Sequence, residues 1–313
     1  MLHSAKDSFE FIASRSHRFR DYLLQNNIRI EKKSVLYTIL NSIDTALSIY
    51  KSGIIPVGIR PNEITSDAAN AWFLAETILC ANGTPFGEIV RPHLSLLASG
   101  DPRHIQAAKS SLQRNKLFEV ILACILNNFA NTPEFVDPPD VVARYKNTLW
   151  GFACKTLSGN LTTAAKRIRE GLNQIEKAQV DFGIVAVQVT NLFPHDQMRF
   201  FNIEGKANTP GSFKNEAPAV HLMNSLFVDL TKKIENARKE NQKKYPHKYT
   251  TKVRGILYIV QSLCVIRKVL HIIGNCRFVQ LWKVVGSELE ICKRINDHLQ
   301  DFGGSTSRKL ILL

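Results

Sequence analysis

The sequence predicts an α/β protein in which a mainly helical N-terminal region, residues 1–100, precedes an α-β-β-α-β core within residues 101–313. Three observations support this fold class. Apolar residues recur at helical spacing through most of residues 8–130. The period then changes, and two runs rich in β-branched and aromatic residues flank a tight turn at Lys146-Asn147. A near-continuous apolar run at 182–189 is typical of a strand that is covered on both faces.

The N-terminal region is expected to consist of several helices. A loop containing glycine and proline at residues 53–61 interrupts the helical pattern. The next helix is expected to begin after Thr65-Ser66-Asp67 and to run to Ala81, with Ser66 or Asp67 as its N-cap, because these side chains accept hydrogen bonds from free N–H groups at helix starts. A further long helix is expected to end near residue 130.

The core is expected to follow in a fixed order. Strands are predicted at 140–144 and 148–157, a helix at 162–178 and the apolar strand at 182–189. A helix at 220–243 and a strand at 254–263 come next, and that strand is expected to join the same sheet. The last helix is expected at 282–301, before a basic, apolar tail.

Composition is that of an ordinary globular protein, with 44% hydrophobic and 22% charged residues. No apolar run reaches the roughly 18–20 residues of a membrane helix, and the polar start of the chain has no secretory signal. A cytoplasmic protein without membrane contact is therefore expected. The six cysteines lie far apart and form no CxxC pair, so they are expected to be small buried residues rather than disulfides or zinc ligands.

The net charge of +14 favours a polyanionic partner, because each neutralised phosphate releases condensed counterions. Residues 232–254 hold nine basic residues against two acidic ones, and Tyr245 and Tyr249 lie between the lysines. A solvated helix face followed by a loop explains the same run, whereas the interleaved aromatic rings suit a nucleic-acid strand. The candidate nucleic-acid-binding residues are Lys239, Lys243, Lys244, Lys248, Lys252 and Arg254.

Three residues carry the candidate chemistry. Glu119 is the only formal charge in residues 117–133, on a helix that is apolar nearly all round, and a carboxylate there is costly unless a cation or hydrogen bonds receive it. Asp140 opens the first strand and Lys155 ends the second, so a hairpin would bring them to one edge. Carboxylates that hold Mg²⁺ beside a lysine suit phosphodiester hydrolysis.

The order of these features resembles the PD-(D/E)XK (restriction-endonuclease-like) nuclease superfamily. The matching segments cover about residues 105–190, and they are Phe118-Glu119, Pro139-Asp140, Ala153-Cys154-Lys155, Gly171 to Gln174 and the apolar run that begins at Gly183. The resemblance implies a restriction-endonuclease-like core with a basic C-terminal extension. It also implies catalytic roles for Asp140, Lys155, Glu119 and Gln174, with Mg²⁺ or Mn²⁺ held by Asp140, Glu119 and the Cys154 carbonyl.

One position departs from that family pattern. Ala153 stands where the triplet carries an acid, and its side chain has no ligand atom. Glu119 could supply the second carboxylate from the helix. The site could instead be degenerate, or the alanine could be an engineered inactivation. These three explanations stay open on the sequence alone.

The function implied by the resemblance is metal-dependent hydrolysis of DNA, with a role in restriction or anti-phage defence as a further hypothesis. The alternative is a catalytically degenerate protein that binds nucleic acid or a partner on the same fold. The sequence does not distinguish DNA from RNA. It also leaves open a protein partner on the helical N-terminal region and a homo-oligomer.

Overall fold

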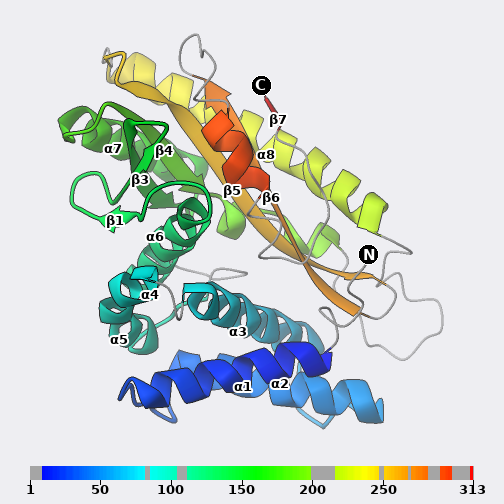
Figure 1. Cartoon of the computed structure of the whole chain (residues 1–313). Coiled ribbons are helices and arrows are strands. Elements are labelled where there is room, and N and C mark those ends of the chain that lie inside the picture. Colours follow the sequence, from blue (N-terminus) through cyan, green and yellow to red (C-terminus); the bar gives the residue numbers. More distant parts are fainter. Residues whose placement is uncertain are drawn as a thin grey trace.

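The computed structural model describes residues 9–81, 85–103, 111–198, 216–246, 250–266, 269–280, 290–297 and 311–312 (Figure 1). The helices are α1 (Phe9–Gln25), α2 (Val35–Ser52), α3 (Pro61–Ala81), α4 (Pro85–Val90), α5 (Leu94–Ala98), α6 (Leu112–Asn127), α7 (Leu161–Lys177) and α8 (Glu216–Lys244). The strands are β1 (Glu134–Phe135), β2 (Val141–Tyr145), β3 (Thr148–Thr156), β4 (Phe182–Gln188), β5 (Val253–Ile266), β6 (Val269–Gln280) and β7 (Ile311–Leu312). Residues 290–297 are also helical.

Helix α3 begins earlier than the sequence pattern predicts. It starts at Pro61, so Ser66 and Asp67 lie inside the helix and the prediction of an N-cap at either residue was wrong. Proline is favoured in the first helical turn, where its missing N–H costs nothing and its fixed φ is already helical. Glu63 in the same turn complements the positive end of the helix dipole.

A tight turn joins β2 and β3, as predicted. Lys146 and Asn147 both have positive φ, 48° and 62°, which is the backbone of a two-residue type I′ hairpin. The two strands pair antiparallel, with Tyr145 opposite Thr148 at the turn and Val141 opposite Phe152 at the far end. This register is what fixes the relative positions of the candidate site residues.

The seven strands form one mixed sheet in the order β1-β2-β3-β4-β5-β6-β7. The first three strands are antiparallel neighbours, whereas β4 is parallel to β3 and β5 is parallel to β4. The prediction that the strand after α8 joins the same sheet is thus confirmed. The long β5–β6 hairpin is antiparallel.

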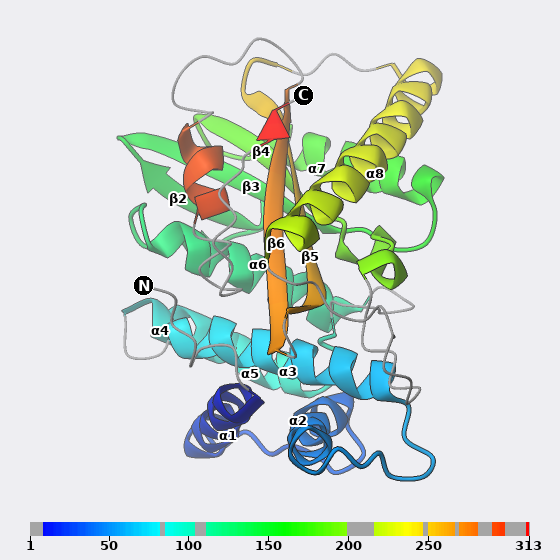
Figure 2. The same ribbon diagram turned by 90° about the vertical axis from the view of Figure 1, so that its right-hand side faces the viewer.

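Helices cover both faces of the sheet (Figure 2). On one face, Ala153, Val185 and Ile256 pack with the buried stripes of α7 and α8 in one hydrophobic cluster. On the other face, Phe152 and Ala186 belong to a second cluster that includes α6 and the N-terminal helices. Alternate residues of β3 and β4 therefore belong to different cores, which is the pattern of strands buried on both faces.

The second cluster continues across residue 100. It contains Phe19 of α1 and Phe73 of α3 together with Phe118 of α6 and Phe152 of β3, so the N-terminal helices and the sheet share one core. Figure 1 shows α1 and α2 as the outer layer of this stack, with α3 between them and α6. Apolar side chains of each helical layer pack against the next layer, and those of α6 pack against the sheet.

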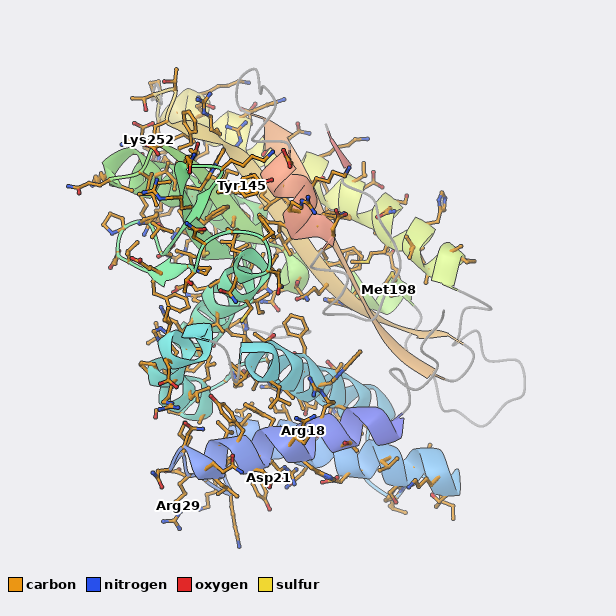
Figure 3. The ribbon with its side chains drawn as sticks, in the orientation of Figure 1. Arg18, Asp21, Arg29, Tyr145, Met198 and Lys252 are labelled. Atoms are coloured by element: carbon orange, nitrogen blue, oxygen red, sulfur yellow. The ribbon has the colours of Figure 1, made fainter. Side chains whose placement is uncertain are left out.

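Helical residues 290–297 lie against the β2–β3 turn. Glu290 accepts hydrogen bonds from the Tyr145 hydroxyl at 2.7 Å and from the Lys146 ammonium at 2.5 Å. Figure 3 shows Tyr145 at this junction. Cys292 in the helical segment, Cys124 and Cys154 are buried and form no disulfide, as the cysteine spacing predicts. None of the helices in the described ranges is both long and apolar enough to cross a membrane.

Candidate active site

The β2–β3 hairpin brings Asp140 beside Lys155. Because Val141 pairs with Phe152, Asp140 stands opposite Ala153, and Lys155 follows two positions later on the same face of β3. Gly151 makes room for the approach, since a Cβ there would lie 2.9 Å from Cγ of Pro139. A larger residue at 151 would push the segment that carries Asp140 away from β3.

Asp140, Cys154 and Lys155 form one connected set of contacts. The Cys154 N–H donates to Oδ2 of Asp140 at 2.7 Å, so the carboxylate takes the place of a backbone acceptor on β3. The Lys155 ammonium donates to the same Oδ2 at 3.3 Å and to the Cys154 carbonyl at 3.1 Å. Both charged side chains are largely buried, with exposed fractions of 13% for Lys155 and 15% for Asp140.

Glu119 lies on α6 in an ion pair with Lys116, one helical turn earlier. Lys116 also lies over the Phe135 ring, with its ammonium 5.3 Å from the ring centroid. Lys116 was not among the site residues predicted from the sequence. The available signal was the i, i+3 spacing, which makes Lys116 and Glu119 neighbours on any helix.

Electrostatics connect Glu119 with the hairpin pair. Burial raises the pKa of Glu119, Lys116 lowers it, and the charges of Asp140 and Lys155 act on the same carboxyl in opposite directions. Burial likewise raises the pKa of Asp140, against the opposing effects of the Lys155 charge and the Cys154 N–H. Two carboxyls and two ammonium groups therefore lie in one partly buried electrostatic cluster.

Cys154 contributes its backbone rather than its thiol. Burial and the neighbouring carboxylates raise the pKa of the Cys154 thiol well above its ordinary value of 9.0. The neutral thiol is a poor metal ligand, since metals bind the thiolate. The backbone N–H and carbonyl of Cys154 are the groups that contact Asp140 and Lys155.

Helix α7 lies directly behind Lys155. A Cβ at Gly171 would meet Cγ1 of Val185 at 2.7 Å and Cγ of Lys155 at 3.4 Å, so the glycine lets the helix rest on the lysine stem. Gln174 follows one turn later. Its Oε1 is buried and accepts no hydrogen bond from the part of the chain that the structure describes. Within the described residues, no hydrogen bond joins Gln174 to Asp140 or Lys155.

The oxygen atoms of the cluster fit the chemistry of a hard divalent cation. Mg²⁺ is usually bound through one or two carboxylates, with water and substrate phosphate completing its shell. Asp140, Glu119 and the Cys154 carbonyl supply oxygen ligands of this kind. Within the described ranges, no three or more His, Cys, Asp or Glu side chains are grouped so as to hold a metal ion.

The six candidate nucleic-acid-binding residues have different surroundings. Lys239 and Lys244 are exposed on α8, and Lys243 is exposed but paired with Glu240 at 2.6 Å. Lys248 lies outside the described residues. These positions agree with a basic face on the second half of α8.

Lys252 and Arg254 make contacts within the fold. The Lys252 ammonium donates to the carbonyl of Ala178 at 2.9 Å, just after the end of α7, and Figure 3 shows Lys252 at this end of the sheet. The Arg254 guanidinium lies 3.7 Å from the centroid of the Phe182 ring. Each is half-buried, so each has a structural role in addition to any contact with a ligand.

Asp140, Lys155 and the Cys154 backbone are thus in direct contact. Glu119 interacts with Asp140 and Lys155 through charge. Gln174 lies on α7, the helix that packs against the stem of Lys155. The chain matches no protein-family model, no curated protein and no solved structure.

Proposed function

We propose that the chain is a metal-dependent, nuclease-like protein that hydrolyses phosphodiester bonds of DNA. The observation that carries the proposal is the Lys155 ammonium, which contacts Oδ2 of Asp140 and the Cys154 carbonyl at 3.3 and 3.1 Å. A carboxylate, a carbonyl and a lysine on neighbouring strands are the groups that this reaction needs.

The order of elements supports a restriction-endonuclease-like core. Helix α6 carries Glu119, the β2–β3 hairpin carries Asp140 and Lys155, α7 carries Gln174, and the apolar strand β4 follows. Strand β4 lies parallel to β3, with α7 as the crossover between them. This order agrees with the one that the sequence resemblance implies.

The residues of the cluster would have different roles in this reaction. Asp140, Glu119 and the Cys154 carbonyl would hold Mg²⁺ or Mn²⁺, which supplies neutralisation of phosphate charge and a water of lowered pKa. Lys155 orients the attacking water and stabilises negative charge that develops on the phosphate. Because Lys155 already contacts Oδ2 of Asp140 and the Cys154 carbonyl, its ammonium would compete with a bound cation for these oxygen atoms.

A second candidate is a nucleic-acid-binding protein without catalysis. The observation that favours it is that each carboxylate of the cluster already has a lysine counter-ion: Lys155 for Asp140 and Lys116 for Glu119. Ala153, at the position of the missing acid, is fully buried against the α7 side of the sheet. A cluster that is neutralised by its own lysines binds a cation more weakly.

Cleavage of supercoiled and linear DNA with Mg²⁺ or Mn²⁺ tests the proposal, with wild type compared with Asp140→Asn and Lys155→Met. The asparagine keeps an oxygen acceptor for the Cys154 N–H, so its loss of cleavage would report on chemistry rather than folding. Asp181→Asn is a matched control, because Asp181 accepts the Leu149 N–H of the same strand at 2.8 Å, at the opposite end of β3.

Loss of cleavage in both site variants, with the control active, is the expected result. Wild type that never cuts with either metal, but still binds DNA, would overturn the enzymatic proposal in favour of the binding protein. Cleavage that survives both site substitutions would exclude this cluster as the active site.

A further inference from the structure

Helices α7 and α8 pack on the same face of the sheet (Figure 2). A shallow groove lies between them. The groove is lined by Ala165, Arg169, Leu172, Arg238, Asn241, Gln242 and Tyr245. On α7 these positions are three or four residues apart, and on the α8 side Asn241 and Gln242 each lie three or four residues from Arg238 and Tyr245, so each set lies on one face of its helix. Neither helix brings an acidic side chain to this lining.

Arg169 presents its guanidinium along one wall. It stacks on Tyr245, with the guanidinium carbon 4.3 Å from the ring centroid. Arg169 is half-buried, and within the described residues no hydrogen bond or ion pair joins it to another side chain. Tyr245 is 56% exposed, so the stacked pair faces solvent with the donor groups of Arg169 available.

Arg238 is held in place by hydrogen bonds to Glu235 and Gln242. Its Nε and Nη2 donate to Oε2 of Glu235 at 3.0 and 2.8 Å, and Tyr258 donates to Oε1 of the same buried carboxylate at 2.5 Å. Nη1 donates to Gln242 at 3.1 Å. A guanidinium has five N–H donors; these three contacts leave two without a partner among the described residues. Arg238 is therefore a rigid cation with spare donors in the groove.

We propose that this groove binds the phosphate groups of a single strand of nucleic acid. Two guanidinium groups with free N–H donors suit phosphate, which they bind through paired hydrogen bonds. The exposed ring of Tyr245 offers a surface for base stacking, a contact that an acidic peptide would not use. The exposed Lys239 and Lys244 extend the positive field along α8.

The exposed ring of Tyr245, just after the end of α8, favours a single strand over a duplex. The exposed faces of paired bases are not available to a stacking side chain, whereas those of a single strand are. The inference rests on the proposed action on nucleic acid and adds where a strand is held.

Fluorescence anisotropy with labelled single-stranded DNA, the RNA of the same sequence and the matched duplex tests the groove, in EDTA so that no cleavage occurs. Arg169→Ala should weaken single-strand binding and reduce the slope of log K against log salt by about 0.7, the value for one lost phosphate contact. Tyr245→Leu should weaken it at least about 5-fold, and Tyr245→Phe should restore it, because the ring alone stacks.

Arg29→Ala is the matched control, because it removes the same charge from an exposed position beyond the end of α1. Figure 3 shows Arg29 in the outer helical layer, away from α7 and α8. Equal losses in Arg29→Ala and Arg169→Ala would reduce the effect to net charge and overturn the proposal. Competition by polyglutamate as effective as by the oligonucleotide would also overturn it.

The two proposals fail in different ways. If cleavage requires Asp140 but binding ignores Arg169 and Tyr245, the groove proposal alone is wrong. If no oligonucleotide binds and no DNA is cut, both are wrong. Binding that depends on the groove in a protein that never cuts would support the groove and the non-catalytic alternative together.

Discussion

Oδ2 of Asp140 accepts the backbone N–H of Cys154 at 2.7 Å, while the Lys155 ammonium reaches the same atom at 3.3 Å. One carboxylate oxygen therefore serves two purposes. It satisfies a strand donor that would otherwise be unpaired, and it holds the charged end of Lys155 next to the sheet. This atom contributes both to stability and to the proposed chemistry, and different substitutions at Asp140 can distinguish the two contributions.

Asp140→Ala should destabilise the fold more than Asp140→Asn. The alanine leaves the Cys154 N–H and the largely buried Lys155 without their acceptor, at a cost of about 1–3 kcal/mol in the free energy of unfolding. The asparagine carbonyl can still accept from Cys154, so its loss should be smaller. Urea unfolding of the three proteins measures the difference. Equal stability of both variants would mean that the Cys154 contact contributes nothing.

Ala153→Glu should lower the melting temperature in EDTA and recover part of the loss in Mg²⁺. Ala153 is fully buried opposite Asp140, so a second carboxylate there is costly unless a cation receives it. A metal that binds only the folded form stabilises it. Thermal melts with and without Mg²⁺ measure the effect, with wild type as the reference. A melting temperature that is insensitive to Mg²⁺ would argue against a cation site here.

Glu119→Gln should change how stability depends on pH. Burial, the largest influence, raises the pKa of Glu119 above its ordinary value of 4.5. Between the unfolded and the folded pKa, the folded protein binds more protons than the unfolded chain, so this group's contribution to stability falls as pH rises through that window. Relative to Glu119→Gln, wild type should therefore lose stability as pH rises from about 4.5.

Denaturant unfolding of both proteins across this pH range gives the comparison. A wild type that gains stability over Glu119→Gln with rising pH would mean that Lys116 outweighs burial. That result would reverse the sign of the predicted shift. Lys116→Met removes the counter-ion of Glu119. If burial dominates, this variant should lose more stability than wild type as pH rises.

Gly171→Ala should destabilise the protein by about 1–3 kcal/mol. The added methyl would lie 2.7 Å from Cγ1 of Val185, which is fully buried and has little space to move. The helix must then move away from the sheet, and the stem of Lys155 loses its support. Thr162→Ala, on the exposed side of α7, is the control and should be nearly neutral. Equal stability of the two variants would show that the helix shifts at no cost.

The local elements of the core could be predicted from the order of the residues alone. Period and turn chemistry placed β2, the Lys146-Asn147 turn, β3, α7 and β4 within a few residues of their observed bounds. A two-residue turn leaves little freedom of register. The meeting of Asp140 with Lys155 could therefore be deduced from residues fifteen positions apart, because the connection between them is short and regular.

The partner of each charged side chain, in contrast, depends on how the elements pack in three dimensions. Glu119 was singled out as an acid on an apolar helix, but its counter-ion Lys116 was not. Lys252, assigned to a nucleic-acid surface, donates to the carbonyl of Ala178, 74 positions earlier in the chain.

The groove between α7 and α8 depends in the same way on packing. Arg169 lies on α7 and Tyr245 just after the end of α8, and the periodicity of either segment alone does not show that the two side chains stack. Helical and strand periods follow from neighbouring residues, so a sequence displays them directly. The energy of a charge depends on which groups lie within a few ångströms of it and on how much water is excluded, and the fold sets both.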